Sequence, residues 1–497
     1  MEKPQGTAPY DRRPALWRAT KIVATVGPSS EQPGALGRLL RAGVDVVRLN
    51  AAHCRPGDIR RRVALVRRAE RRRGRPVGVL LDLGGPKIRL GAVAGGALRV
   101  AAGQVVELAP GIPPAPEVRG AVRVQVTYGA LLSDLSPGSE IRIDDGKVRL
   151  RVERRRAGAL RAKVLVGGAL RTGAGVNFPD TALSAPALTP KDRRDLREGL
   201  AAGIDLVGLS FVRSAAHVEE LRRALSRVPE GRRPWIVSKI ERPEALAGLA
   251  AIAAASDALM AARGDLGVEI GLAAVPGAQA RILAAGEAAS IPVIVATQML
   301  ESMIESPVPT RAEVSDVAGA VHGGADAVML SGETAVGRFP VEAVRTMAEI
   351  ARTAERTGER ASRTIPPFAG ENESDIASAV ARAAAAAALA SGATAVVVYT
   401  ESGRTARLVS KLGLGVPIVA FTPDDRVRRK MTLLSDVVSF RIARTRSVDR
   451  MLAAGNRFLS GLKVLSGRTV VEVSGAARAE GATNTVRIRR IGGRKGA

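Results

Sequence analysis

The fold is decided by residues 292–333, which open with PVIVATQM (292–299) and close with AVMLSGE (327–333), two short apolar runs with a helical stretch between them. Six earlier segments share this pattern: KIVATVG (21–27), DVVRLN (45–50), VGVLLDL (77–83), LVGLSFV (206–212), WIVSKIE (235–241) and ALMAARGD (258–265). Short, almost wholly apolar strands that alternate with helices predict a parallel sheet covered on both faces. Eight such units predict a (β/α)₈ barrel.

One interval between the predicted strands is much longer than the others, because the third run begins at residue 77 and the fourth at residue 206. Within it, residues 91–177 form short alternating segments separated by Gly and Pro turns, such as EIRIDDGKVRLRV (140–152). Alternation of this kind is typical of half-buried strands. We therefore predict a small all-β domain inserted at 91–177, and a barrel made of 1–90 and 178–355.

A third domain follows the barrel. The stretch RTGERASRTIPPFAGENES (356–374) is polar and contains prolines, which indicates a linker. Helical segments then alternate again with apolar runs, among them AVVVYT (395–400) and PIVAFT (417–422). The fold class is therefore α/β, with a (β/α)₈ barrel, an inserted β domain and a C-terminal α/β domain at 356–497.

The composition limits the classes of partner. The chain has 497 residues, a formal net charge of +27 and 2% aromatic residues. Such a charge attracts anions, but the arginines are spread along the whole chain, and few aromatic side chains are available for base stacking. We interpret the charge as an Arg-rich solvated surface, so a nucleic-acid partner is not expected.

The same reading indicates a cytoplasmic protein that does not enter a membrane. Cys54 is the only cysteine, so no intrachain disulfide can form, and a reducing compartment is expected. The N-terminal segment holds no apolar run of signal-peptide length. The longest uncharged apolar stretch, 383–399, is interrupted by Ser391, Gly392 and Thr394, so it fits a helix and a strand better than a membrane span.

Polar residues end the predicted strands, where a (β/α)₈ barrel carries its active site. They are Arg48, Asn50, Asp82, Ser210, Lys239, Glu241, Arg263, Asp265, Thr297, Gln298 and Glu333. Glu241 and Asp265 end neighbouring strands and are predicted ligands of Mg²⁺, or of Mn²⁺ in its place, because Mg²⁺ prefers one or two carboxylates plus substrate oxygens. Lys239 lies two residues before Glu241 and therefore points the same way; it would offset charge on a transferring phosphoryl group. The alternative is a structural Lys–Glu ion pair.

Two further motifs are less decisive from the residues alone. The segment ARGDLGVEI (262–270) leaves a strand and begins a helix, so its backbone amides suit a carboxylate or a phosphate; a plain tight turn is the alternative. His53 follows the second strand. The neighbouring Cys54 is either a reactive thiol or a small apolar filler.

At these residues the sequence resembles the pyruvate kinase family, over about Lys21 to Gly492. The longest similar segments are KIVATVGPSS (21–30), SKIERPE (238–244), MAARGDLGVEI (260–270), ATQMLESMI (296–304), PTRAEVSDVA (309–318) and DAVMLSGETAVGRFPVEAV (326–344). The resemblance implies a cytoplasmic glycolytic enzyme that converts phosphoenolpyruvate and ADP into pyruvate and ATP. It also implies that the (β/α)₈ barrel is catalytic and that the inserted domain at 91–177 is a mobile small β-barrel lid. It further implies a regulatory C-terminal domain and a homotetramer.

The resemblance also implies residue roles. Glu241 and Asp265 would hold Mg²⁺, Lys239 would stabilise phosphoryl transfer and the enolate, and Thr297 would stand near the methylene carbon where a proton arrives. The substrate carboxylate would bind the amides of Gly264 and Asp265. Arg48 would be catalytic as well as contact phosphate. The remaining substrate or nucleotide contacts would come from Asn50, His53, Arg89, Asp145 of the lid and Ser210.

The sequence departs from the family's pattern at its monovalent-cation corner. A serine and a threonine that usually bind K⁺ are replaced by Ala52 and Leu83, and a glutamate is replaced by Lys87. Asn50 and Asp82 remain from that site. We predict that the Lys87 ammonium replaces the monovalent cation, so that K⁺ is not required; the alternative is drift in a site that still binds K⁺ weakly.

Two other positions qualify the resemblance. A lysine that usually precedes Gly-Val-Asn is Ala174, which leaves the nucleotide affinity open unless Arg171 supplies the contact. In YTESGRTARLV (399–409), the loop residues resemble the family's effector-phosphate loop and would bind a phosphorylated allosteric effector; an ordinary capped helix is the alternative. The predicted effector residues are Thr400, Ser402, Gly403, Arg404 and Thr405.

Two rival functions follow from the same residues. A metal-dependent aldolase acting on pyruvate or phosphoenolpyruvate would share the Glu241 and Asp265 pair but would need neither the lid nor the third domain. A non-catalytic relative could use the basic surface to bind nucleic acid. The presence of Arg48, Lys239 and Thr297 argues against the second rival.

Overall fold

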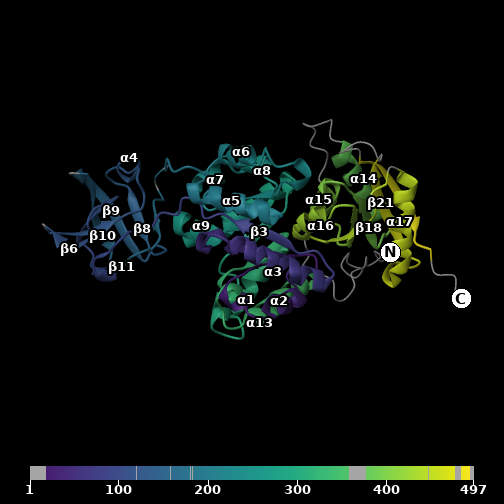
Figure 1. The fold of residues 1–497 in the computed structure, drawn as a ribbon, viewed down its shortest axis with the longest axis horizontal. Helices are drawn as coiled ribbons and strands as arrows, with labels where there is room; N and C mark the ends of the chain where they lie inside the picture. The colour runs from purple at the N-terminus through teal and green to yellow at the C-terminus, as the bar shows by residue number, and fades with distance from the viewer. Residues whose placement is uncertain are drawn as a thin grey trace, which may run out of the picture.

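The fold was taken from a computed structural model, which describes residues 18–118, 120–156, 158–179, 181, 183–357, 376–445, 447–475 and 483–492. Three bodies follow one another along the long axis of the molecule, with the lid at one end, the barrel in the middle and the C-terminal domain at the other end (Figure 1). Most of the predicted linker at 356–374 lies outside the described residues. The boundaries given above for the three domains remain predictions.

The eight predicted strands are all present and close into a parallel barrel in the order β1-β17-β16-β15-β14-β13-β3-β2. Their bounds are β1 Lys21–Thr25, β2 Val46–Asn50, β3 Gly78–Asp82, β13 Leu206–Leu209, β14 Trp235–Ile240, β15 Ala258–Ala262, β16 Val293–Ala296 and β17 Ala327–Leu330. Every residue of these eight strands is buried except Asn50 at the end of β2, which explains their almost wholly apolar sequences. The predicted (β/α)₈ barrel is therefore confirmed.

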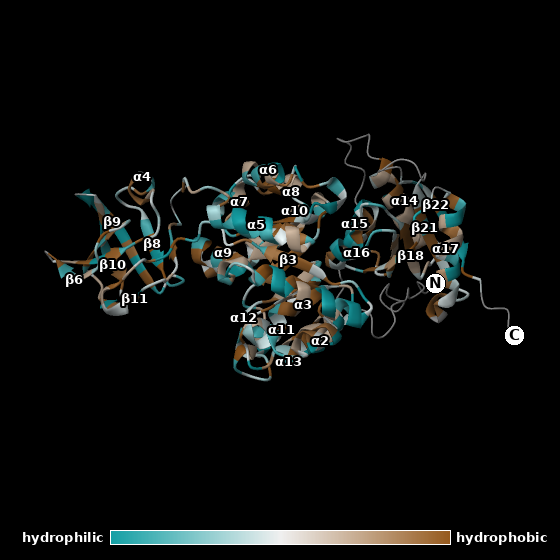
Figure 2. Ribbon diagram, viewed as in Figure 1, coloured by the Kyte–Doolittle hydropathy of each residue, from teal (hydrophilic) through white to brown (hydrophobic). Residues whose placement is uncertain are grey.

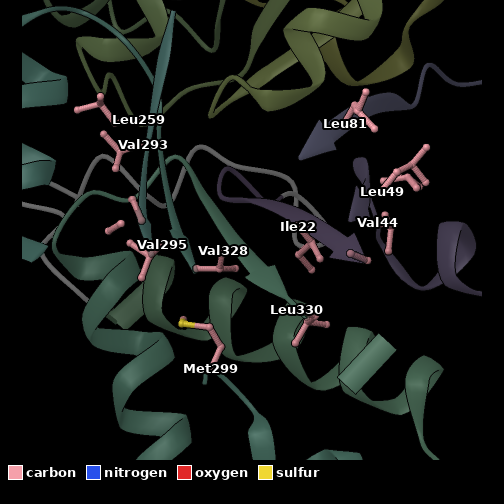
Figure 3. Packing of buried hydrophobic residues seen from close by; sticks show 14 of the residues in the cluster. Ile22, Val44, Leu49, Leu81, Leu259, Val293, Val295, Met299, Val328 and Leu330 are labelled. Atoms are coloured by element: carbon pink, nitrogen blue, oxygen red, sulfur yellow. The ribbon is translucent and has the colours of Figure 1, made fainter. Parts of the chain in front are cut away.

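Helices surround the barrel and cover its outer face. They are α1 Pro28–Glu31, α2 Ala35–Ala42, α3 Asp58–Arg73, α5 Pro190–Ala202, α6 Ala215–Ala224, α7 Pro243–Ala247, α8 Leu249–Ala255, α9 Arg263–Ile270, α10 Val275–Ala288, α11 Arg311–His322, α12 Gly332–Ala335 and α13 Pro340–Thr357. Local sequence fixes several of their starts: α5 and α11 begin with capping boxes at Thr189 and Thr310. Between strands and helices lies one apolar layer, in which Leu49, Leu81 and Val328 are fully buried (Figure 3).

The inserted lid is a β domain with its own core. A seven-stranded mixed sheet runs in the order β12-β8-β9-β10-β5-β7-β6, and β11 pairs with β4 in a second sheet. The bounds are β4 Ala97–Val100, β5 Val105–Ala109, β6 Ala115–Val118, β7 Ala121–Gln125, β8 Glu140–Ile143, β9 Val148–Arg156, β10 Ala159–Val166, β11 Gly168–Arg171 and β12 Val176–Asn177, with a short helix α4 Leu131–Asp134. Its apolar cluster is separate from that of the barrel.

The C-terminal domain is an α/β sandwich, as predicted. Its sheet runs β20-β19-β18-β21-β22, with only β22 antiparallel. The bounds are α14 Ile376–Ala390, β18 Ala395–Tyr399, α15 Arg404–Lys411, β19 Ile418–Thr422, α16 Asp425–Lys430, β20 Val437–Arg441, α17 Val448–Gly461, β21 Thr469–Gly475 and β22 Thr483–Arg490. Apolar sequence is concentrated in central strands such as β18 and in the Ala-rich α14 (Figure 2).

The C-terminal domain packs against the amino ends of the barrel strands. Side chains of the barrel interior, such as Leu80 and Trp235, belong to one apolar cluster together with Val409 and Leu433 of the C-terminal domain. The approach is so close that a Cβ at Gly78 would lie 2.6 Å from Thr432 Oγ1. The barrel floor is therefore closed by the C-terminal domain.

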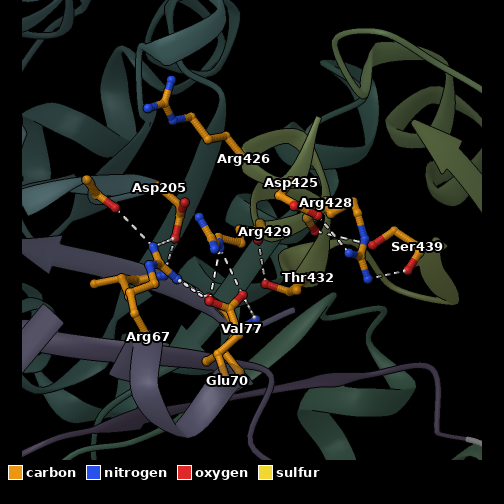
Figure 4. A network of polar contacts seen from close by, with 12 residues as sticks. Arg67, Glu70, Val77, Asp205, Asp425, Arg426, Arg428, Arg429, Thr432 and Ser439 are labelled. Atoms are coloured by element: carbon orange, nitrogen blue, oxygen red, sulfur yellow. Dashed lines mark hydrogen bonds and ion pairs between the residues drawn. The ribbon is translucent and has the colours of Figure 1, made fainter. Parts of the chain in front are cut away.

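Charged side chains complete this interface. Arg429 of α16 donates to both carboxylate oxygens of Glu70 on α3, at 2.8 and 3.2 Å, and next to it, within the barrel, Arg67 pairs with Asp205 at 2.5 Å (Figure 4). At the end of α15, Lys411 Nζ lies 2.7 Å from Asp326 Oδ2, and both side chains are 3% exposed. A buried pair of this kind ties two segments firmly, because removal of one charge leaves the other unpaired in a dry site.

In the described part of the chain, no single helix is both long enough and apolar enough to cross a membrane. Among the same residues, α9 and the helical stretch Leu272–Ala288 pass by length and composition only as a pair, which is bent by 119°.

Candidate active site

A lysine lies at the centre of a buried charged cluster at the carboxyl end of the barrel. Lys239 Nζ lies 2.8 Å from Glu241 Oε1 and 3.4 Å from Asp82 Oδ2, and it donates a 2.8 Å hydrogen bond to Ser210 Oγ. Arg48 on β2 adds a 2.7 Å ion pair to Asp82. Five of the polar residues predicted from the strand ends therefore converge.

The charges of this cluster determine each other's ionisation. Burial would lower the pKa of the Lys239 ammonium, but the carboxylates of Asp82 and Glu241 outweigh it and raise this pKa. Burial would raise the pKa of Asp82, but the charges of Lys239 and Arg48 hold it below its ordinary value. For Glu241, burial raises the pKa in spite of the opposing Lys239 charge. Lys239 is therefore a fixed positive charge at neutral pH.

Two carboxylates at this site fit a divalent cation. Glu241 Oε1 is buried and makes no hydrogen bond, although it lies beside Lys239. Asp265 stands in the first turn of α9, and after burial and Lys239 its charge is the next influence on the pKa of Glu241. No group of three or more His, Cys, Asp or Glu side chains that could hold a metal occurs among the described residues. The carboxylate pair matches the way Mg²⁺ binds, with most of its remaining ligands supplied by water and substrate.

The loop after β16 is held in a strained conformation. Thr297 is β-branched and has φ 71, in the left-handed region that such residues rarely adopt. Its Oγ1 accepts from Gly264 N at 2.7 Å and donates to Ala296 O at 2.6 Å. Arg263, which is buried, donates to Thr297 O at 2.8 Å and pairs with Asp316 at 2.6 Å. Strain of this kind persists only where neighbours enforce it, and Arg263 supplies that restraint.

Basic side chains line the open side of the cluster. Lys87 Nζ lies 4.0 Å from Asp265 Oδ1, and its side chain is 42% exposed. Arg89 donates to Gly173 O at 2.8 Å. His53 is exposed at the rim, and its pKa is lowered first by partial burial and then by the charges of Arg89 and Lys87. The rim therefore presents positive charge to solvent, with a neutral His53 at pH 7.

The remnants of the predicted monovalent-cation corner have other partners. Asn50 Oδ1 accepts from Ala52 N at 3.1 Å and caps the short 3₁₀ turn Ala51–His53. Asp82 pairs with Arg48 and Lys239, as described above. Leu83 is buried and offers only its backbone carbonyl, which accepts from Ser210 Oγ at 2.7 Å. Lys87 makes its ion pair with Asp265.

Two further residues singled out in the sequence, Glu333 and Cys54, are buried in surroundings that indicate a structural role. Glu333 is fully buried, and its carboxylate accepts from Ser331 N at 2.6 Å and Leu300 N at 3.2 Å, so it anchors loops. The Cys54 thiol is buried, and burial raises its pKa. A raised pKa means little reactive thiolate, which favours the reading of Cys54 as a small apolar filler.

An open cleft lies between the lid and the barrel. Residues from both domains line it, among them Lys87, Asn177, Phe178, Phe211, Arg242 and Asp265. Asp145 stands exposed in the turn between β8 and β9 with φ 57. Arg171 lies 4.0 Å from Asp144 and has a 64% exposed side chain.

The predicted effector loop caps a helix. Gly403 has φ 89, which favours glycine, and it precedes α15. Its N–H donates to Thr400 Oγ1 at 2.9 Å, and Arg404 N donates to Ser402 Oγ at 3.4 Å. Thr405 is buried, with its hydroxyl 2.7 Å from that of Thr483. Ser402 and Arg404 face solvent.

Sequence reasoning missed a set of residues that connects the lid with the segments of Glu241 and Asp265. They are Asn177, Arg242 and Glu269. Asn177 and Glu269 lie 92 positions apart, and only the resemblance to a known family covered their segments, without indicating any contact between them.

Comparison with known proteins gives one consistent family. The model described as "Pyruvate kinase, barrel domain" matches residues 17–344, and "Pyruvate kinase, alpha/beta domain" matches residues 378–489. Pyruvate kinase of Agrobacterium vitis is 41% identical over 96% of this chain and 99% of its own, and that of Mycobacterium tuberculosis is 40% identical over the same shares. A solved pyruvate kinase of Cryptosporidium parvum superposes with a TM-score of 0.87 at 30% identity, covering 96% of this chain and 97% of its own.

Proposed function

Because the chain belongs to the pyruvate kinase family, we propose that it transfers the phosphoryl group of phosphoenolpyruvate to ADP at the cluster around Lys239 and releases pyruvate and ATP. The observation that carries this proposal is the buried convergence of Lys239, Glu241, Asp82 and Arg48 beside Asp265. Neither the aldolase nor the nucleic-acid-binding alternative is favoured, since the matches extend over the barrel and the C-terminal domain.

Each residue of the site has a role that its surroundings support. A divalent cation held by Glu241 and Asp265 would draw negative charge from the phosphoryl group. Lys239, kept protonated by its carboxylate neighbours, offsets charge on the same group and on the enolate oxygen left behind. The amides of Gly264 and Asp265 open α9, where a substrate carboxylate is favoured.

The remaining roles are phosphate binding and delivery of the proton to the product. Arg48, Asn50, His53, Arg89 and Ser210 lie around the cluster and would bind phosphate oxygens, and Asp145 would approach when the lid closes. Thr297 Oγ1 is held by two hydrogen bonds at a strained position. From the family resemblance, we infer that this hydroxyl marks the point where the proton reaches the methylene carbon. The test is a coupled assay for pyruvate formation from ADP and phosphoenolpyruvate, with Mg²⁺ and with Mn²⁺.

The charge of Lys87 replaces the monovalent cation in this proposal. Its ammonium stands at the mouth of the site beside Asp265, and Leu83 and Ala52 offer no side-chain oxygen. An ammonium and K⁺ carry the same charge, so the local field is preserved without a bound ion. The enzyme is therefore expected to work without K⁺.

Replacing Lys87 with glutamate is expected to lower kcat/KM for phosphoenolpyruvate by about tenfold or more in K⁺-free buffer, and K⁺ is expected to restore part of it. The restoration stays partial because Ala52 and Leu83 still lack ligand oxygens. The coupled assay measures this with tetramethylammonium as the inert counter-ion. Lys147→Glu, at an exposed lid lysine, is the control. Collapse of wild-type activity in K⁺-free, Na⁺-free buffer would contradict the proposal.

An effector phosphate would bind at the loop that begins α15. The helix offers a route to the catalytic strands: Arg407 lies 6.0 Å from the ring centre of Trp235 at the start of β14, and Lys411 pairs with Asp326 before β17. β14 carries Lys239. A phosphate that orders the loop would therefore change the contacts of α15 with the floor of the barrel.

Phosphorylated metabolites are expected to shift the phosphoenolpyruvate saturation curve to lower concentration, and the double variant Ser402→Ala/Arg404→Ala is expected to lose at least half of that shift. The loss follows because phosphate contacts from a hydroxyl and a guanidinium are charge-assisted. Saturation curves with sugar phosphates and AMP at millimolar level measure it. Unchanged wild-type curves would rule out regulation by the compounds tested. The cytoplasmic location and the homotetramer stay predictions from the family.

A further inference from the structure

Helix α9 carries a metal-binding carboxylate at one end and a second, buried carboxylate at the other. Asp265 is in its first turn, and Glu269 follows four residues later, about 6 Å further along the axis. Glu269 is 4% exposed. Any displacement of Glu269 along or about the axis of this short helix therefore also moves Asp265.

Glu269 joins two segments that carry the catalytic carboxylates. Its Oε1 accepts a 2.8 Å hydrogen bond from Arg242, which directly follows Glu241. The two side chains are 4% and 1% exposed, so the pair is closed to water. The backbone next to Glu241 and the helix that begins at Asp265 are thus fastened to each other.

The same oxygen also binds the lid. Asn177, the last residue of β12, donates from Nδ2 to Glu269 Oε1 at 2.8 Å. β12 pairs with β8 of the lid sheet, and Arg142 on β8 donates to the carbonyl of Val268. Two adjacent residues of α9 are therefore held by the lid.

Arg242 is bound by the returning lid segment as well. Its NH2 donates to Phe178 O at 3.3 Å and Thr181 O at 3.0 Å, residues that follow β12. It also pairs with Glu244 at 3.2 Å. The contacts of Arg242 therefore divide between the lid segment, α9 and a local carboxylate.

The second oxygen of Glu269 shows that this network is not an ordinary surface ion pair. Glu269 Oε2 is buried and has no hydrogen-bond partner. A buried carboxylate is costly unless it is paired, and here only Oε1 is satisfied. Burial raises the pKa of Glu269, against the opposing charge of Arg242. Such a cost is expected where a residue serves a purpose besides stability.

We propose that Glu269 is a positioning residue that couples the lid hinge to the two metal-binding carboxylates, through its shared hydrogen bonds with Asn177 and Arg242. The proposal rests on the function proposed above and deepens it. When the lid moves, Asn177 and Arg142 pull on the end of α9. Asp265 then moves relative to Glu241, so that the cation site is at full strength in only one position of the lid.

The test measures cation binding without turnover, using Mn²⁺ and the electron paramagnetic resonance signal of the free ion. Glu269→Gln is expected to weaken Mn²⁺ binding to the full-length, substrate-free enzyme about tenfold, as for other residues that orient metal ligands. Glu244→Gln, which removes a partner of Arg242 but leaves both hydrogen bonds to Glu269 Oε1 in place, is the matched control and is expected to stay within twofold of wild type.

The variant Asn177→Ala tests the contact between the lid and Glu269. The Asn177 side chain is half-buried, and its removal leaves the ion pair between Arg242 and Glu269 intact. This variant is expected to weaken Mn²⁺ binding severalfold, and the double variant Asn177→Ala/Glu269→Gln is expected to bind no worse than Glu269→Gln, since both act through one oxygen. Circular dichroism checks that each variant folds. If Glu269→Gln does not fold, the Mn²⁺ affinity of Asn177→Ala alone tests the proposal. Mn²⁺ affinities of Glu269→Gln and Asn177→Ala equal to that of Glu244→Gln would overturn the proposal. A wild type that binds Mn²⁺ but forms no pyruvate would contradict the proposed function instead.

Discussion

Replacing Lys239 with methionine is expected to reduce kcat for pyruvate formation by about 10³-fold or more. The loss has two sources. The transferring phosphoryl group loses a fixed positive charge, and Glu241 and Asp82 lose the ammonium that lies 2.8 and 3.4 Å away. Steady-state kinetics at saturating phosphoenolpyruvate, ADP and Mg²⁺ measure the effect.

Two variants make this expectation specific. Lys239→Arg keeps the charge but spreads it over a planar fork that cannot replace a compact ammonium between two carboxylates, so intermediate activity is expected. Lys163→Met, at an exposed lid lysine on β10, is expected to match wild type. A Lys239→Met enzyme with a normal circular dichroism spectrum and less than tenfold loss would remove Lys239 from the reaction.

The largest effect on stability is expected from Lys411→Met, which leaves Asp326 buried without its 2.7 Å ammonium partner. Breaking a buried pair from one side costs about 3–5 kcal/mol. The double variant Lys411→Met/Asp326→Asn removes the stranded charge but keeps an acceptor for Val293 N, so it is expected to be more stable than Lys411→Met alone. Equilibrium urea unfolding followed by circular dichroism measures the free energy of unfolding.

An exposed pair provides the comparison for this experiment. Lys147 and Asp144 lie 3.2 Å apart with side chains 69% and 29% exposed. Lys147→Met is expected to cost less than about 1 kcal/mol, because water screens such pairs. If Lys411→Met unfolds at the same urea concentration as Lys147→Met, the pair at the barrel floor does not hold the two domains together.

The sequence predicted the barrel because a buried parallel strand has a short, almost wholly apolar sequence, which can be recognised locally. Each of the eight apolar runs became a strand, and Lys239 and Glu241 share a direction because side chains alternate along a strand. The lid was predicted only as a β domain. Its short helix α4 and the parallel pairing of β5 with β7 depend on contacts between distant strands, which no local pattern records.

The site was predictable in its strand-end residues and less so in its contacts. Arg48, Asp82, Ser210, Lys239 and Glu241 meet because all follow or end parallel strands, whose carboxyl ends lie at one rim. The partners of Asn50 and Lys87 could not be predicted in this way. Rotamers and loop paths decide that Asn50 caps a turn and that Lys87 reaches Asp265, and neither is encoded by spacing. The Glu269 network was missed for the same reason.

The closed floor of the barrel has a consequence for how such a protein can change by gene recombination. Leu80 and Trp235 of the barrel share one apolar cluster with Val409 and Leu433 of the C-terminal domain. An ancestor that lost or exchanged its C-terminal domain would have exposed this cluster to water and left Asp326 without Lys411. The lid has a separate core, so its exchange would leave the barrel core covered, but a replacement would have to keep the contacts of Asn177 and Arg142 with α9. In this architecture a new lid must match α9 at its hydrogen bonds, whereas a new C-terminal domain must match a whole apolar surface.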